Sequence, residues 1–112
     1  MEIGTGVVIG ENCIISAHTF IPPCVTIGND VFIGPGVVFT NDKYPPGPKD
    51  KWLSTFVEDG VSIGAGVVIL PGVTIGRGSK IGAGSVVTHD ITYSDWIYGN
   101  PANLTKKGVV DL

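Results

Sequence analysis

Hydrophobic residues recur every six positions along almost the whole chain. Of the 15 positions on this lattice between residues 3 and 87, 13 carry a large apolar side chain, and the two exceptions are Pro45 and Lys51. A period of six fits neither an amphipathic helix nor an ordinary meander, so it predicts short strands joined by tight bends around a triangular prism. The apolar lattice residues are Ile3, Ile9, Ile15, Ile21, Ile27, Ile33, Phe39, Val57, Ile63, Ile69, Ile75, Ile81 and Val87.

A second series of small or β-branched residues follows the lattice four positions later, as at Val7, Thr19 and Ser79. Both series are expected to point inward, where large and small side chains alternate to fill a narrow core. Three hexapeptides make one coil, and Gly-x-Gly corners such as Gly64-Ala65-Gly66 supply the backbone freedom for the bends. The stretch from Ile3 to Thr92 then gives five coils, roughly 24 Å in height at the strand spacing. The predicted fold is an all-β parallel β-helix.

One segment interrupts the lattice. Residues 39–56 read FTNDKYPPGPKDKWLSTF, and their prolines and charges are incompatible with regular strands. The segment spans three hexapeptides, so we expect a bulge of one coil's length after which the lattice resumes in phase at Val57. Its role is either an ordinary solvent loop or an arm that reaches a neighbouring subunit. The expected organisation is a prism at 1–92 with an inserted loop at about 42–56, followed by a cap and tail at 93–112.

Composition and charge narrow the classes of function. The net charge is −3, and the only local basic cluster is Lys106-Lys107, which argues against a nucleic-acid partner. No run of residues has the length of a membrane span, and the first residues lack a signal-peptide pattern, so no membrane association and a cytoplasmic location are expected. Cys13 and Cys24 match no zinc spacing and are expected to be reduced thiols.

The chain resembles the hexapeptide-repeat acyltransferases from residue 3 to about 104. The resemblance is carried by IGPGVVFTNDKYPPGP, by VSIGAGVVILPGVTIGRGSKIGAGSVVTHDI and by YGNPAN. Its FTN-x-x-x-P stretch is most similar to the branch that N-acetylates amino sugars carried on nucleotides. The resemblance implies a left-handed β-helix and a homotrimer with active sites in the grooves between prisms. It also implies acetyl-CoA as the donor and no metal.

His18 is the candidate catalytic residue. It occupies a corner three residues after Ile15, and histidine is well suited to removing a proton near neutral pH. The alternative is an exposed corner residue without a role. The related O-acetyltransferases of simple sugars place a histidine before a proline where this chain has Tyr44. An amine is a competent nucleophile once neutral, so this departure favours N-acetylation. O-acetylation of a simple sugar and a non-catalytic scaffold are the alternatives.

The resemblance also implies binding residues. The acceptor sugar is expected to contact Thr40, Asn41, Asp42 and Tyr44, and Asn41 lies on a different edge of the prism from His18, so the two converge only across a groove between subunits. The pantetheine arm of coenzyme A is expected to pass Ala65 and Ala83. Other candidate contacts of the donor are Thr88, His89, Asn103 and Lys106 or Lys107.

Two of these assignments have an alternative, and one related activity is disfavoured. His89 stands where the family often has a lysine, and otherwise it is a surface residue. Trp96 and Tyr98 are expected to seal the last coil, with adenine stacking as the alternative. Zinc-dependent carbonic anhydrases of the same prism fold require three histidines. This chain has two, which excludes that activity.

Overall fold

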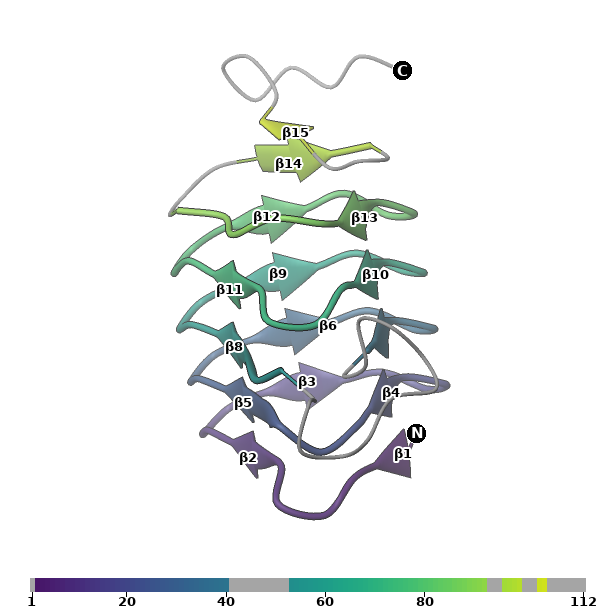
Figure 1. The fold of residues 1–112 in the computed structure, drawn as a ribbon, viewed down its shortest axis with the longest axis vertical. Coiled ribbons are helices and arrows are strands. Elements are labelled where there is room, and N and C mark those ends of the chain that lie inside the picture. Colours follow the sequence, from purple (N-terminus) through teal and green to yellow (C-terminus); the bar gives the residue numbers. More distant parts are fainter. Residues whose placement is uncertain (1, 41–52, 93–95, 100–102, 105–112) are drawn as a thin grey trace.

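The computed structural model describes residues 2–40, 53–92, 96–99 and 103–104. Three parallel sheets form the sides of a prism, as the hexapeptide lattice predicts (Figure 1). The chain runs from β1 across the front to β2, passes behind through β3 and rises to β4, so the β-helix is left-handed. Sheet A contains β1 (Glu2–Ile3), β4 (Phe20–Ile21), β7 (Val38–Phe39), β10 (Val68–Ile69) and β13 (Val86–Val87).

The other two sheets complete each coil. Sheet B contains β2 (Val8–Ile9), β5 (Val25–Ile27), β8 (Thr55–Val57) and β11 (Thr74–Ile75). Sheet C contains β3 (Ile14–Ile15), β6 (Phe32–Ile33), β9 (Ser62–Ile63), β12 (Lys80–Ile81), β14 (Trp96–Tyr98) and β15 (Asn103–Leu104). All pairings are parallel among these strands except that of β14 with β15, which is antiparallel. The expected five coils are confirmed.

Strand pairing corrects the expected size of the insertion. Partners on neighbouring coils are separated by three hexapeptides below the insertion, as in Val8↔Thr26, and above it, as in Ser62↔Lys80. Across the insertion they are separated by five hexapeptides, as in Thr26↔Phe56 and Val38↔Val68. The bulge is therefore two hexapeptides long rather than three. Thr55–Val57, which the sequence assigned in part to the loop, form β8 within the third coil.

The last coil is shorter than the others. Ile75 pairs with Ile91, and Ile81 with Ile97, so these partners are closer in sequence than three hexapeptides. The chain takes only four residues from Val87 to Ile91, where the coil directly below takes six from Ile69 to Ile75. The Asp90 side chain compensates for the two missing residues, because its carboxylate accepts the Thr74 backbone N–H at 2.9 Å. Since β14 is in register with β12, the prism continues through Tyr98, and the expected boundary at residue 92 falls inside the fifth coil.

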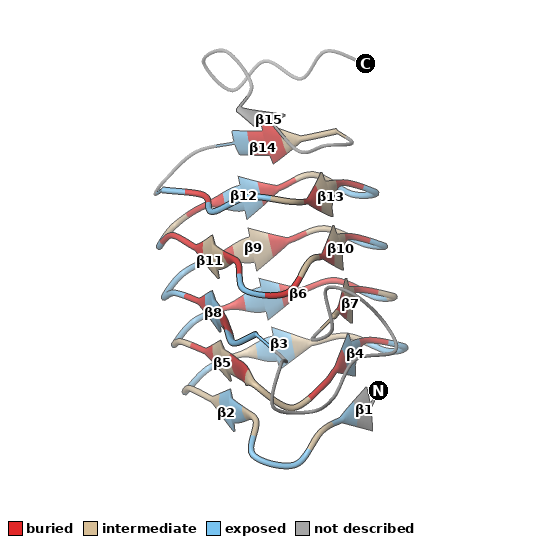
Figure 2. Cartoon of the chain, in the orientation of Figure 1, coloured by how far each residue is buried: buried red, intermediate tan, exposed pale blue. Residues whose placement is uncertain are grey.

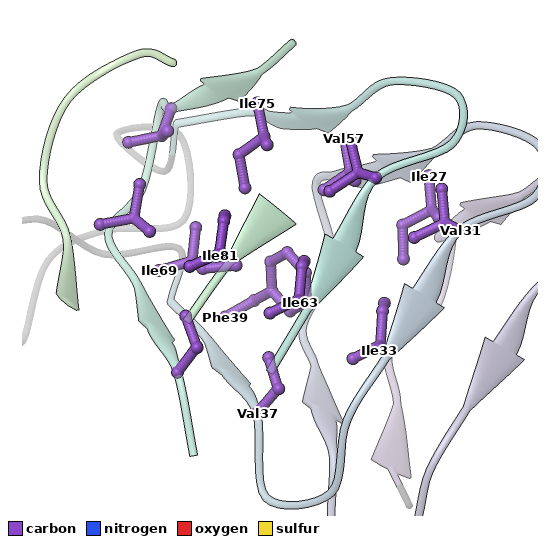
Figure 3. Packing of buried hydrophobic residues seen from close by; sticks show 14 of the residues in the cluster. Ile27, Val31, Ile33, Val37, Phe39, Val57, Ile63, Ile69, Ile75 and Ile81 are labelled. Atoms are coloured by element: carbon purple, nitrogen blue, oxygen red, sulfur yellow. The ribbon is translucent and has the colours of Figure 1, made fainter. Parts of the chain in front are cut away.

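The core confirms the inward orientation of both residue series. Side chains from the three sheets meet in the interior, with Phe39, the largest fully buried one, among aliphatic neighbours (Figure 3). Lattice residues Ile21, Ile33 and Ile63 are fully buried, and so is the second-series residue Val61. Where the second series is polar, its hydroxyls bond to the backbone, as Ser79 Oγ does by donating to Gly76 O at 2.7 Å and Thr55 Oγ1 by accepting the Gly72 N–H at 3.2 Å. Each buried hydroxyl bonded in this way avoids an unsatisfied polar group.

Candidate active site

The edge between sheets C and A carries the candidate catalytic histidine. We call it corner CA and define it as residues 16–19, 34–37, 64–67 and 82–84. Its turns stack through backbone hydrogen bonds, from Gly36 N to Ala17 O at 3.1 Å, from Gly66 N to Pro35 O at 2.9 Å and from Gly84 N to Ala65 O at 2.9 Å. His18 therefore shares one edge with Ala65 and Ala83, two and three coils above it.

Corner CA presents an open surface above His18. Ala65 and Ala83 are both exposed, and a Cβ placed on Gly66 or Gly84 would meet no atom within 4 Å. Small residues and bare backbone leave room for a narrow, extended ligand to lie along this edge. His18 is exposed at its lower end and has a φ of 62°. The equivalent residues Gly36, Gly66 and Gly84 also have positive φ, so His18 replaces glycine in this column.

The edge between sheets A and B carries the insertion. We call it corner AB and define it as residues 4–7, 22–24, 40, 53–54, 70–73 and 88–90. The Thr40 hydroxyl donates to Ile69 O at 2.9 Å, which holds the start of the insertion against the coil above. Asn41, Asp42 and Tyr44 lie outside the described residues.

Corner AB also contains Thr88 and His89 at its upper end. The Thr88 hydroxyl lies 2.8 Å from His89 Nδ1, and the imidazole is exposed. Because corner AB and corner CA flank opposite sides of sheet A, the structure separates Thr88 and His89 from Ala65 and Ala83. It likewise separates Thr40 from His18. Only the backbone of Asn103 is described, in β15, and Lys106 and Lys107 lie outside the described residues.

The third edge, corner BC (residues 10–13, 28–31, 58–61 and 76–79), contains a polar ladder that the sequence reasoning missed. Asn29 Oδ1 accepts the Glu11 N–H at 2.8 Å, and Asp59 Oδ1 accepts the Asn29 N–H at 2.7 Å. Glu58 Oε1 accepts the Arg77 N–H at 3.1 Å. Glu58, Asp59 and Arg77 line an open depression. These side chains pair corner N–H groups from one coil to the next, which explains their position without a ligand.

Three further observations concern the described residues. In the described part of the chain, no three His, Cys, Asp or Glu side chains are grouped so as to hold a metal ion. Nor do residues 2–40, 53–92, 96–99 and 103–104 include a helix long and apolar enough to cross a membrane. Cys13 and Cys24 are free thiols.

Comparison with known proteins identifies the family. Residues 6–41 and 54–89 match the bacterial transferase hexapeptide family (six repeats). The chain belongs to this family. The two matched segments stop on either side of the insertion, in agreement with the strand register.

Relatives of this hexapeptide-repeat chain are named as acetyltransferases with different acceptors. It is 34% identical over 113 residues to the galactoside O-acetyltransferase of Lactococcus lactis subsp. lactis, covering 96% of this chain and 53% of that protein. It is also 34% identical over 82 residues to the 2,3,4,5-tetrahydropyridine-2,6-dicarboxylate N-acetyltransferase of Staphylococcus aureus (strain MRSA252), covering 73% of this chain and 33% of that protein.

A solved structure extends the comparison. The maltose O-acetyltransferase of Clostridium difficile 630 matches with a TM-score of 0.78 and 29% identity, over 95% of this chain and 65% of that one. The chain therefore spans about half the length, or less, of these two curated relatives, and about two thirds of the solved one. The family and the left-handed β-helix are shown, whereas the names of the relatives differ in the acceptor.

Proposed function

We propose that this chain transfers the acetyl group of acetyl-CoA to the amine of an amino sugar, in particular one linked to a nucleotide. The observation that carries the proposal is the shared edge of His18, Ala65 and Ala83, because it combines a proton acceptor with an open track for an extended thioester donor. In the proposed arrangement the pantetheine arm lies along corner CA and its thioester points toward His18. No metal takes part.

The proposed reaction is an attack of the neutral amine on the thioester carbonyl. The new C–N bond forms a tetrahedral intermediate, the C–S bond then breaks, and coenzyme A leaves as a thiolate. His18 accepts the proton lost by nitrogen and passes it to the departing sulfur. Backbone N–H groups at a corner are suited to stabilise the oxyanion.

The proposed active unit is a cytoplasmic homotrimer. The outward residues Phe20, Val38, Val68 and Val86 make the outer face of sheet A apolar, and Phe20 is 37% exposed. Corner CA and corner AB flank this face. Packing around sheet A would bring His18 of one protomer toward the insertion of the next, where the acceptor contacts Thr40, Asn41, Asp42 and Tyr44 are proposed. Because Thr88 and His89 lie at corner AB, they are proposed as donor contacts across the same groove, from the next protomer, and Asn103 and Lys106 are further proposed donor contacts.

A hydroxyl acceptor is the second candidate function. It is favoured by the similarity to the galactoside and maltose O-acetyltransferases. A sugar hydroxyl ionises far above neutral pH and requires activation by a base, whereas an amine loses one proton to become nucleophilic. The two candidates therefore predict different consequences of removing His18.

The test measures thiol release with matched amino and hydroxy sugars, free and nucleotide-linked. We expect turnover of the amino sugar. We also expect His18→Asn to lower kcat/KM for the amino sugar by at most about 10⁴-fold, the upper end of the usual contribution of a general base. Asn tolerates positive φ, so this variant removes the base while keeping the corner conformation. Turnover of the hydroxy sugar that equals that of the amine and collapses in His18→Asn would establish O-acetylation instead. Absence of turnover with every acceptor would support a scaffold.

A further inference from the structure

Two outward side chains on sheet C form a pair near the upper end of corner CA. Lys80 on β12 and Trp96 on β14 are partners in the strand register, and Lys80 Nζ lies 5.8 Å from the centroid of the indole. Trp96 is 47% exposed, and Lys80 is exposed. The pair is a cation resting over an aromatic ring on a surface open to solvent.

Sealing of the last coil is carried out by other residues. Ile97 points inward and is 6% exposed. Tyr98 packs against Gly82 so closely that a Cβ at Gly82 would collide with its ring. The sequence expectation that both Trp96 and Tyr98 close the prism therefore holds for Tyr98 only, and the core does not require the indole of Trp96.

The position of this pair relates it to the proposed donor track. Lys80 precedes Ala83 by three residues, so at most about 10 Å of chain separates them. Strand β14 leads to Gly99, whose N–H donates to Ser85 Oγ at 3.1 Å and whose carbonyl accepts the Val86 N–H at 3.0 Å. Lys80 and Trp96 thus lie on the outer face of the sheet that leads into corner CA, in the fourth and fifth coils, whereas His18 lies in the first coil of that corner.

We propose that Trp96 and Lys80 bind the nucleotide end of the acetyl donor, an inference that rests on the proposed function. The adenine base stacks on the indole, and the Lys80 ammonium pairs with a phosphate of the same nucleotide. A nucleotide has a base that stacks on an aromatic side chain and phosphates that pair with a cation, and Trp96 and Lys80 supply these two partners. The thioester then points down corner CA toward His18.

Binding of the nucleotide half alone tests this subsite without acetyl transfer. The probe is 3′-phosphoadenosine 5′-diphosphate, titrated against a Trp52→Phe background in which Trp96 is the remaining tryptophan. We expect quenching of Trp96 fluorescence and a dissociation constant by calorimetry that rises about tenfold in Trp96→Ala, within the range of base stacking. Lys80→Gln is expected to weaken binding less, and Trp96→Phe to retain part of it. The matched control is Phe32→Ala, which removes another exposed aromatic residue from the outer face of sheet C, three coils below.

Kinetics provide the second readout. Trp96→Ala should raise the KM for acetyl-CoA by the factor seen in binding and leave the KM for acetyl-pantetheine, which lacks the nucleotide, unchanged. Nucleotide binding that is absent in the wild type, or equal in Trp96→Ala, overturns the subsite even if acetyl transfer occurs. Binding that depends on Trp96 in a protein that transfers no acetyl group supports the subsite and overturns the proposed function.

Discussion

The first coil and the upper coils are built from one repeat but differ in how well they are closed. Ile3 in the first coil is 44% exposed, whereas its column equivalents Ile21, Phe39 and Ile69 are fully buried. Figure 2 shows the same gradient, with buried residues concentrated above the first coil. In a solenoid each repeat is stabilised by its neighbours, and among the described strands β1, β2 and β3 each pair with a strand on one side only. A residue's place in the stack therefore decides its contribution to stability.

The two regions also differ at their corners. In the first two coils positive φ is adopted by Asn12, His18, Cys24 and Asp30 as well as by Gly6 and Gly36, whereas at the described corners of the upper coils it is adopted by glycine alone, as at Gly60 and Gly66. Glycine adopts this conformation without the steric cost that a Cβ imposes. The first coil thus combines weaker burial with two of these more demanding corners, at Asn12 and His18, which makes it the region expected to open first.

The largest expected effect compares two lattice isoleucines. Ile63 is fully buried in the middle of the stack, so Ile63→Ala should lower the free energy of unfolding by about 2–5 kcal/mol. Ile3→Ala removes the same atoms from a half-exposed site and should cost well under half as much, because less area returns to water and no closed cavity forms. Denaturant unfolding of both variants measures the difference. Equal losses would show that the first coil is as well packed as the third.

The second expected effect concerns the ladder at corner BC. Asp59→Ala removes the acceptor of the Asn29 N–H between the second and third coils and should cost about 0.5–1.5 kcal/mol, the range for one hydrogen bond. Asp59→Asn retains an acceptor oxygen and serves as the control. Asn29→Ala acts one coil lower, on Glu11, and should speed amide exchange in the first coil with little change in global unfolding. Uniform exchange across the coils would contradict the difference between the two regions.

The sequence predicted the fold because the period of six encodes both core and corners. The two residue series lie inside the prism as expected, and His18 stacks below Ala65 and Ala83 on one edge. Such a lattice depends on local spacing alone and can be read without knowledge of strand pairing. It also indicated an insertion between Phe39 and Val57, although Thr55 and Phe56 belong to β8 and not to the loop.

Other features were hidden by the same period. An insertion of two hexapeptides and one of three both return the lattice to phase at Val57, so only pairing such as Thr26↔Phe56 separates them. The shortening of the last coil moved Ile97 and Trp96 off the lattice, and the outward pairing of Trp96 with Lys80 left no signal in the spacing. The separation of Ala83 and His89 onto different edges was also missed, because the family resemblance groups them by ligand and not by corner.

The smallest expected effect tests the corner conformations in one column. Gly60 has a φ of 71°, and a Cβ there would meet the Gly78 backbone at an ordinary 3.9 Å, so Gly60→Ala should lose about 1 kcal/mol from backbone strain alone. Asp30, one coil below, has a φ of 58°, and Asp30→Gly should be neutral or gain a few tenths of a kcal/mol because relief of the strain offsets the added flexibility of the unfolded chain. Opposite signs in chemical denaturation would locate the cost in the corner backbone. A loss from Asp30→Gly as large as that from Gly60→Ala would mean that the Asp30 side chain itself stabilises the lower coils, and that their corners are not the weaker ones.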